Sequence, residues 1–428
     1  MKKILLSGLL ATMTSFLFAQ DIDKLINAKE AERIEKILSS DAMEGRAVFT
    51  VAIDRAAAFI ASEFNAIGLQ PWKSGGGYLQ PFSLIRAKPL SVSATLDETA
   101  IDAKDVVVVS PDSIVKADGS SGYEKVAITA GTNLFSEASK YAQSGKNYIV
   151  LVDTSYAKNF SRLAGLRRQV FNTDKTIIFI ITALHPTRFA VTYTQEVTPA
   201  KLANVVGVLP GKSKKNEYVI FSGHYDHLGI GKQAVNGDSI YNGANDDAAG
   251  TTAVIMLAKY FKEKGDNERT LVFAAFTGEE SGGFGSHYFS RQFDPATVMA
   301  MFNIEMIGTE SKWGRNSAFI TGYEKTDMGK ILEKNLQGSG FSFYPDPYTE
   351  QSLFYRSDNA TLARLGVPAH TISTSKMDIE PNYHKVSDEI QTLDMSNMAM
   401  IIKSIAISSG TIVSGKDTPS RVNTSDLR

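Results

Sequence analysis

The chain has 428 residues, with 45 Lys and Arg against 46 Asp and Glu, and a formal net charge of -1. This balance argues against a protein that binds nucleic acid through its phosphates, because such binding needs an excess of Lys and Arg. The sequence contains no cysteine, which excludes disulfides, a thiol nucleophile, Cys-ligated zinc and a lipid anchor on cysteine. Any metal must therefore be held by carboxylates and by the six histidines.

The first 19 residues predict a signal peptide. Lys2 and Lys3 precede an apolar run over residues 4–18, and Ala19 lies at the −1 position of a suitable cleavage site. This run is shorter than the roughly 20 apolar residues that span a bilayer, and no later stretch is long and apolar enough. We therefore expect an exported protein without a membrane span, periplasmic or secreted after cleavage near Ala19.

Residues 20–88 are expected to form the N-terminal helical part of the main domain. Apolar residues recur at three- and four-residue spacing from Ile22 to Leu38, which predicts a helix. A second helix is predicted over residues 52–67, because Gly68 is a typical C-terminal signal.

Residues 89–197 differ in character and predict a smaller β-rich module inserted into the main domain. Short runs of β-branched and aromatic residues are separated there by Gly, Ser and Asp clusters. These runs cover residues 105–109, 147–152, 176–182 and 190–193.

Residues 198–414 alternate strand and helix patterns. Strands are expected over residues 217–222, 270–276 and 299–304, and a helix over residues 248–262. This alternation predicts an α/β fold with a mostly parallel central sheet flanked by helices. The ligand crevice of such a sheet lies at the carboxyl ends of the strands, and a polar cluster follows each predicted strand here. Residues 415–428 are expected to form a polar tail.

The first polar cluster contains His224, Asp226 and His227. These residues could be zinc ligands with an orienting carboxylate, because a ligating imidazole usually donates its other N–H to one. A polar loop with one hydrogen-bonded core histidine is an equally good interpretation. His384 could likewise be a ligand or a surface histidine. The remaining histidines have no carboxylate pattern around them and are expected to be structural or surface residues: His185, His287 and His370.

Five acidic residues follow the next strands and loops, at three places in the chain. Asp246 and Asp247 could cap a helix, or one of them could bridge two metals. Glu279 and Glu280 directly follow an apolar strand between glycines, where one could ligate a metal while the other acts as a base. Glu305 interrupts an apolar segment, and an ionised Glu is costly to bury there unless it is paired or metal-bound.

Together these clusters offer histidines and several carboxylates, an N/O ligand set that suits Zn²⁺. Two zinc ions about 3.5–4 Å apart need a bridging carboxylate and a water between them. The count works if Asp246 bridges, while His224 and His384, each with a further carboxylate, hold one ion apiece.

Five motifs resemble those of the co-catalytic di-zinc aminopeptidases, in the same order and at about the same spacing. They are GHYDH, GANDDAAG, FTGEESG, NIEMIG and NYHKVSDE, within residues 205–389. That family includes bacterial leucyl-type aminopeptidases and, more distantly, glutamate carboxypeptidase II. Residues 38–69 resemble the opening segment of these enzymes, and the β-rich module is similar in placement to the protease-associated insert of some members.

The resemblance implies a fold, a cofactor and a ligand set. The expected cofactor is Zn²⁺, two ions per chain, bound by His224, Asp246, Glu280, Glu305 and His384. Asp246 would bridge the two ions. Glu305 stands where the family more often has Asp, which leaves the geometry and metal preference at that position open.

The resemblance also implies the roles of neighbouring residues and the reaction. Glu279 would be the general base, and Tyr383 would stabilise the oxyanion. Asp226 would orient His224, while Asp247 would shape the turn beside the bridging carboxylate. The expected reaction is hydrolysis of the N-terminal residue of peptides with a free N-terminus, by a hydroxide held between the metals.

Other functions on the same fold remain open at this point. A glutaminyl cyclase uses one zinc ion and similar ligands, whereas a carboxypeptidase needs a basic pocket, for which Arg356 and Arg364 are candidates. A non-enzymatic binding protein would be expected to have lost Glu279 or a ligand. A group of aromatic residues could line an apolar side-chain pocket or could simply belong to the core and its rim: Phe341, Phe343, Tyr344, Tyr348, Phe354 and Tyr355.

Overall fold

The computed structural model describes residues 22–73 and 76–427, and it divides the chain into two units. The first unit contains the chain up to Pro81 and again from Ala203 onward, and the second unit is Phe82–Leu202. Both borders fall inside long strands, β2 (Leu79–Leu96) and β9 (Phe189–Leu209). The limits of 89 and 197 expected for the inserted module lie inside these same strands, seven and five residues from the observed borders at 82 and 202.

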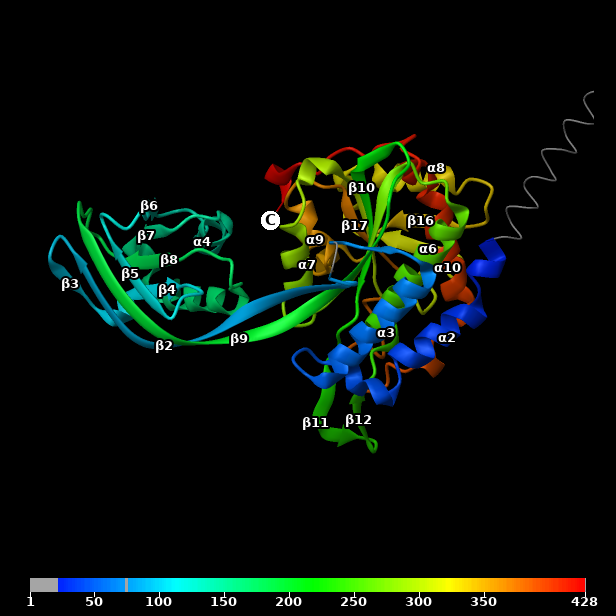
Figure 1. The fold of residues 1–428 in the computed structure, drawn as a ribbon, viewed down its shortest axis with the longest axis horizontal. Coiled ribbons are helices and arrows are strands. Elements are labelled where there is room, and N and C mark those ends of the chain that lie inside the picture. Colours follow the sequence, from blue (N-terminus) through cyan, green and yellow to red (C-terminus); the bar gives the residue numbers. More distant parts are fainter. Residues whose placement is uncertain (1–21, 74–75, 428) are drawn as a thin grey trace, which may run out of the picture. The chain divides into compact units, whose positions relative to one another are not determined.

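The first unit is built on a mostly parallel sheet (Figure 1). Its strand order is β16 (Ser342–Pro345), β15 (Ser317–Ile320), β17 (Ala369–Ser373), β14 (Val298–Ile304), β10 (Lys214–His224), β13 (Arg269–Phe276) and β9. The central pairs β17–β14, β14–β10 and β10–β13 are parallel, whereas β9 pairs with β13 in the antiparallel sense. The predicted fold class is therefore confirmed.

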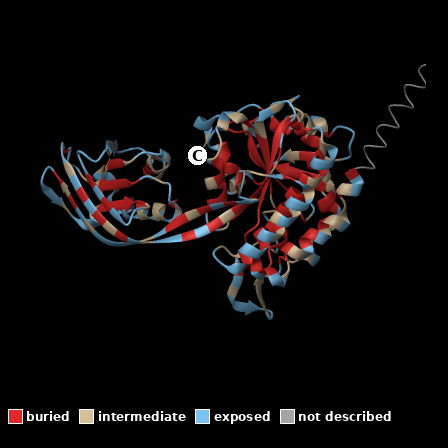
Figure 2. Cartoon of the chain, in the orientation of Figure 1, coloured by how far each residue is buried: buried red, intermediate tan, exposed pale blue. Residues whose placement is uncertain are grey.

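Helices cover both faces of this sheet. One face packs against α2 (Ala28–Leu38), α3 (Val51–Ile67), α6 (Ala249–Lys264), α8 (Met328–Asn335) and α10 (Met395–Ser408). The other face packs against α7 (Phe284–Ser290) and α9 (Asn359–Ala363). Successive residues of β13 alternate between the two faces and are all buried, as Figure 2 shows for the central strands. Burial on both faces explains why the strand reads as a continuous apolar run.

The expected helix boundaries of the first unit are close to the observed ones. The helix α3 ends at Gly68, whose φ of 78° lies in the left-handed region that favours glycine. The predicted helix over residues 248–262 is α6. Two short strands, β11 (Gly229–Val235) and β12 (Asp238–Tyr241), form an antiparallel hairpin after the first polar cluster.

The second unit has its own sheet and its own apolar clusters. The four-stranded sheet has the order β4 (Val106–Val109), β8 (Ile177–Ile181), β7 (Tyr148–Val152) and β6 (Glu124–Ile128). Elsewhere in the unit β5 (Ile114–Asp118) pairs with β9, and β3 (Thr99–Ile101) pairs with β2. The helices α4 (Leu134–Gln143) and α5 (Ala157–Phe160) accompany the four-stranded sheet, so the unit is mixed α/β rather than purely β-rich.

The sequence predicts a signal peptide at the N-terminus and a polar tail at the C-terminus. The predicted signal peptide, residues 1–19, lies outside the described residues. Across residues 22–73 and 76–427, no helix combines the length and the apolar character that crossing a bilayer requires. After α11 (Gly410–Val413), part of the expected polar tail packs on the first unit, because Val422 is buried and Ser420 bonds with Asp327.

Candidate metal centre

Four of the predicted site residues lie at or just after the carboxyl ends of three adjacent parallel strands. His224 is the last residue of β10, Glu279 and Glu280 follow β13, and Glu305 follows β14. Because the carboxyl ends of parallel strands meet at one edge of a sheet, these side chains converge there. Asp246, in the turn before α6, joins them at the edge of a cavity that holds about 530 Å³ of empty space.

A first group of possible metal ligands consists of His224, Asp246 and Glu305. Their ligand atoms lie within 4.8 Å of one another; His224 and Asp246 are buried, and Glu305 is half-buried. The His224 Nε2 atom lies 3.2 Å from the Asp246 Oδ1 atom. This arrangement leaves room for one small cation between an imidazole and two carboxylates.

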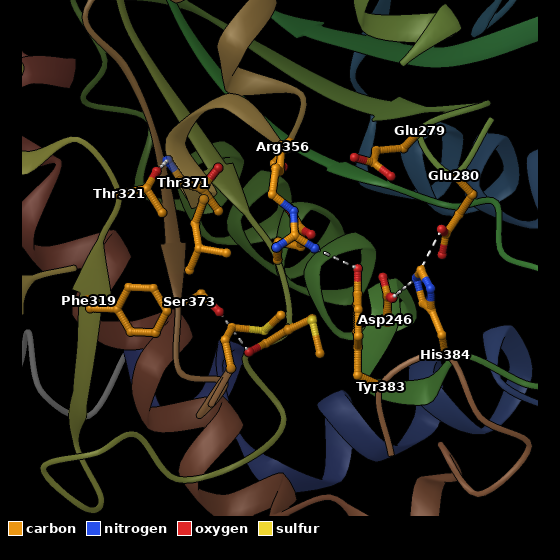
Figure 3. Close-up of a pocket in the computed structure, with 15 residues that line it drawn as sticks. Asp246, Glu279, Glu280, Phe319, Thr321, Arg356, Thr371, Ser373, Tyr383 and His384 are labelled. Atoms are coloured by element: carbon orange, nitrogen blue, oxygen red, sulfur yellow. Dashed lines mark hydrogen bonds and ion pairs between the residues drawn. The ribbon is translucent and has the colours of Figure 1, made fainter. Parts of the chain in front are cut away.

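A second group contains His227 and Glu280 and shares Asp246 with the first. The His227 Nδ1 atom lies 2.7 Å from Glu280 Oε1. His384 reaches the same place, with its Nε2 atom 3.2 Å from Asp246 Oδ2 and 3.1 Å from Glu280 Oε2 (Figure 3). The structure thus brings together all five residues predicted as ligands, and it adds His227, which the sequence left open.

The polar atoms of these groups fit a bound metal. His224 Nε2, Asp246 Oδ2, Glu280 Oε1 and Glu305 Oε2 are buried, and none makes a hydrogen bond of good geometry within the described residues. Buried polar atoms are normally hydrogen-bonded, because an unpaired one costs about 1–3 kcal/mol. Ligation by zinc satisfies such atoms, and nitrogen and carboxylate oxygen are donors that zinc accepts.

Asp247 holds the backbone around the site rather than facing the ligand groups. Its Oδ2 atom accepts the N–H of His224 at 3.1 Å, and its Oδ1 atom accepts those of Gly250 and Met306 at 2.9 and 3.1 Å. A Cβ atom at position 250 would lie 2.4 Å from the Asp247 carboxylate, so this close approach requires glycine. Asp247 therefore ties together β10, α6 and the segment after β14.

Asp226 acts through two different atoms. Its backbone carbonyl oxygen lies 3.1 Å from His224 Nδ1, whereas its carboxylate Oδ1 is 3.8 Å away. That same Oδ1 atom accepts the backbone N–H of Glu279 at 3.1 Å. The sequence interpretation gave the orienting role to the carboxylate, but in the structure the carbonyl contacts the ring and the carboxylate positions Glu279.

Asp388 is a positioning residue that the sequence analysis did not select. It is buried, and its two carboxylate oxygens accept the backbone N–H groups of Asn245 and Asp246 at 2.9 and 3.0 Å. It therefore fixes the turn that presents the shared ligand. The signal was present in the sequence, since Asp388 belongs to the same motif as His384.

Arg46 is a second positioning residue that was missed. Its guanidinium is fully buried and donates to four backbone carbonyls. They belong to Leu38, Tyr225, Asn242 and Gly243, at 2.6 to 2.9 Å. Arg46 thereby joins the segment after α2 to the two loops that carry the possible metal ligands His227 and Asp246.

Residues 204–407 match peptidase family M28. These residues form an M28 peptidase domain. The predicted resemblance to the co-catalytic zinc aminopeptidases is thus confirmed at the level of the family, and the five quoted motifs fall almost entirely inside the matched range.

Two curated relatives are similar to part of the chain. A probable zinc metalloprotease of Pyrenophora teres f. teres is 33% identical over 114 residues, 26% of this chain and 24% of that protein. Leucine aminopeptidase 1 of Neurospora crassa is 24% identical over 209 residues, 46% of this chain and 50% of that protein. The chain thus spans between about a quarter and a half of the length of these relatives.

Solved structures share the fold over most of the chain. An aminopeptidase from Aneurinibacillus sp. strain AM-1 has a TM-score of 0.54 and 18% identity, covering 94% of this chain and 96% of that one. The glutaminyl cyclase of Bacteroides thetaiotaomicron has a TM-score of 0.50 and 13% identity, covering 92% and 99%. At these identities the likeness establishes the fold, which both enzyme types share.

Glu279 lies in the cavity of the M28 domain next to the ligand groups (Figure 3). Burial raises the pKa of its carboxyl group well above the ordinary value, an effect that the nearby carboxylates increase and His224 opposes. A carboxylate with a raised pKa is a stronger proton acceptor, which is the property that a general base needs.

Tyr383 lies flat against the ring of His384, the next residue in the chain. Its ring stacks on the His384 ring, with centroids 3.9 Å apart and planes at 21°. Its hydroxyl oxygen accepts a hydrogen bond from Arg356 Nη2 at 3.4 Å, and both side chains line the cavity (Figure 3). The hydroxyl of Tyr383 is therefore available to donate its own proton into the cavity.

The apolar wall of the cavity comes from residues other than those predicted. It is formed by Met306, Phe319, Leu353 and Met377. The prediction of an aromatic pocket is wrong, because none of its six residues lines this cavity. Phe343, Tyr348 and Phe354 are buried elsewhere, where their rings contribute to packing. His370 is also structural, since its ring nitrogens meet Thr321 and Thr326.

Proposed function

We propose that the M28 domain is a zinc-dependent aminopeptidase that removes the N-terminal residue of peptides. The observation that carries the proposal is the pair of ligand groups that share Asp246. In this proposal His224 and Glu305 hold one zinc ion, and His384 and Glu280 hold the other. His227 lies close enough to Glu280 to complete the second site.

The residues of the chain divide the work of peptide hydrolysis between them. Bound zinc supplies a polarised water and positive charge near the scissile carbonyl. Glu279 takes a proton from the attacking water and passes it to the leaving amine. The Tyr383 hydroxyl donates to the oxygen on which negative charge develops, and its contact with Arg356 favours that orientation.

The cavity also favours a substrate with a free amino terminus. Asp246, Glu279, Glu280 and Glu305 all line it, and the carboxylate oxygens that bound zinc leaves free can accept hydrogen bonds from the free amino group of a substrate. The apolar wall opposite offers contact to an apolar first side chain (Figure 3). The similarity to a leucine aminopeptidase also supports cleavage from the N-terminus of the peptide.

A substrate panel tests this proposal against its alternatives. Purified protein is assayed with a free-amine leucyl peptide, the same peptide with its N-terminus acetylated, and a peptide with N-terminal Gln. Turnover of the free-amine peptide alone is expected. Turnover of the blocked peptide indicates a carboxypeptidase or endopeptidase instead. Pyroglutamate formation from the Gln peptide indicates a glutaminyl cyclase, and no turnover of any peptide indicates a binding protein.

We also propose that the protein is exported by its N-terminal signal. The support is the basic start and the apolar run over residues 4–18. Intact-mass analysis of the natively expressed protein is expected to show a chain that begins at Gln20. A mass that includes residues 1–19 contradicts the proposal.

A further inference from the structure

A second pocket of the M28 domain adjoins the cavity of the metal centre. The two share Glu279, Arg356 and Ser357 in their walls. The other walls of the second pocket come from α7, from α9 and from the segments that precede these helices. It holds about 560 Å³ of empty space, including its open mouth, which is ample for an amino-acid residue.

Asp358 lies in the wall of this pocket, and its carboxyl group makes no hydrogen bond of good geometry within the described residues. Its side chain is 2% exposed, and neither carboxylate oxygen has a hydrogen-bond partner within the described residues. Burial raises the pKa of Asp358, and the nearby Ser286 hydroxyl, which also lines the pocket, opposes this rise, although the Ser286 hydrogen bond of good geometry goes to the Gly283 carbonyl at 3.2 Å. Burying a carboxylate without a partner costs free energy. A cationic or N–H group that enters the pocket can therefore bind favourably to Asp358.

Two arginines line the same pocket near solvent. Arg356 and Arg364 are both exposed, and neither forms an ion pair with a carboxylate in the described part of the chain. The Arg364 guanidinium lies 6.0 Å from the centroid of the Tyr355 ring. Arginine binds carboxylates with paired, charge-assisted hydrogen bonds. Burial, with the charges of Arg291 and Arg364, lowers the pKa of His287 to about 4, so this residue of the wall is neutral at pH 7.

The proposed reaction places the leaving group in this second pocket. Hydrolysis breaks the C–N bond: the water's hydroxyl goes to the carbonyl carbon and its proton, by way of Glu279, to the nitrogen. The leaving amine must therefore lie against Glu279, which lines both pockets. The first residue of the substrate faces the metal centre, so the residue that leaves enters the second pocket.

We propose that the second pocket binds the leaving amino acid of a dipeptide, with its amine against Asp358 and its α-carboxylate between Arg356 and Arg364. A free amino acid carries both charges on one carbon atom, which matches a buried carboxylate below two exposed guanidinium groups. The inference rests on the proposed aminopeptidase function and narrows its preferred substrates to dipeptides.

The test compares the dipeptide Leu-Gly with leucyl-glycinamide, which lacks only the terminal charge. We expect the full-length protein to show a kcat/KM about tenfold higher for Leu-Gly than for the amide, the effect of a charge-assisted hydrogen bond. Arg364→Gln is expected to lower kcat/KM for Leu-Gly about tenfold, mainly through KM, and to bring the ratio close to one. Arg188→Gln, at an exposed arginine of the second unit, is the matched control and keeps the ratio.

A second variant examines the amine. Asp358→Asn is expected to reduce turnover of Leu-Gly more than turnover of leucine p-nitroanilide, because nitroaniline leaves without becoming charged. Equal losses on the two substrates overturn the role given to Asp358.

The outcomes separate this inference from the function on which it rests. Equal kcat/KM for Leu-Gly and its amide, or an unchanged ratio in Arg364→Gln, overturns the dipeptide pocket and leaves the aminopeptidase standing. Failure to hydrolyse Leu-Gly, its amide and leucine p-nitroanilide overturns both.

Discussion

The two units of the chain satisfy their polar groups in opposite ways. Within the described residues, every buried side-chain nitrogen or oxygen atom without a hydrogen-bond partner lies in the first unit. Most of these atoms lie at the carboxyl edge of its sheet. The second unit keeps its ion pairs at the surface, for example Arg188–Glu98, where the side chains are 74% and 81% exposed. A fold tolerates unpaired buried polar atoms where a ligand is to meet them, so the contrast locates the chemistry in the first unit.

The largest effect is expected from Glu279→Gln. The amide keeps the volume of the side chain but cannot accept the proton, so kcat should fall about 10³-fold, or about 4 kcal/mol of transition-state stabilisation. Steady-state hydrolysis of a leucyl peptide measures this, with zinc content determined on the same sample. Glu98→Gln in the second unit is the matched control and should change neither quantity. A Glu279→Gln variant with full activity removes the proposed base.

Arg46→Gln sharpens the contrast in stability. The change leaves up to four buried carbonyls without their donor, and we expect the free energy of unfolding to fall by about 3 kcal/mol. Urea denaturation measures it. Arg188→Gln, whose ion pair is exposed, should cost no more than about 0.5 kcal/mol. Equal costs for the two arginines would mean that Arg46 does not organise the site.

Zinc removal is expected to destabilise the M28 domain and abolish hydrolysis. Chelation leaves the carboxylates of Asp246, Glu280 and Glu305 close together without a counter-charge. Zinc at 100 times its dissociation constant should contribute about 2.7 kcal/mol, seen as a higher melting temperature in calorimetry after zinc is restored. Asp246→Asn is expected to lose most of that response. A melting temperature and an activity that chelator leaves unchanged contradict the metal centre.

The smallest effect concerns a buried acid away from the metal centre. Glu35 lies in the core of the first unit, where one oxygen accepts from Thr252 and the other has no partner. Burial raises its pKa to about 8. The folded state therefore holds a proton that the unfolded state releases above about pH 4.5, so this stabilisation is complete below that pH and is lost as pH rises toward 8.

Replacing that acid should flatten the pH dependence. We expect Glu35→Gln to raise the free energy of unfolding at pH 8 by about 2 kcal/mol relative to the unchanged chain, with little difference at pH 4.5. Urea denaturation at both pH values measures the slope. Glu98→Gln, at an exposed position, provides the control, and an identical slope in Glu35→Gln and the unchanged chain would contradict the account.

Sequence reasoning predicted the elements that depend on local pattern. The apolar runs that became β10, β13 and β14 are legible because both faces of a parallel sheet are buried, and the polar residues after them fall at one edge by geometry alone. For this reason the sequence places His224, the pair Glu279 and Glu280, and Glu305 at one edge of the sheet, whereas the choice of Glu280 as the ligand comes from the family resemblance.

Contacts between residues far apart in the sequence could not be predicted in the same way. Arg46 and Asp388 act on backbone atoms far away in the chain, and those contacts cannot be read from the residues next to them, although Asp388 does share a motif with His384. The aromatic pocket failed for a related reason, since the rings of Phe343 and Phe354 pack into the cores of the first unit. The borders of the second unit lie inside continuous strands, so the sequence pattern places them only to within several residues.

The zinc content of the purified, extensively dialysed protein tests the central claim most directly. Two ligand groups that share one carboxylate predict about two zinc ions per chain, falling to less than one in Asp246→Asn. A chain that retains no zinc, or an Asp246→Asn variant that still holds two ions, would contradict the shared-carboxylate centre.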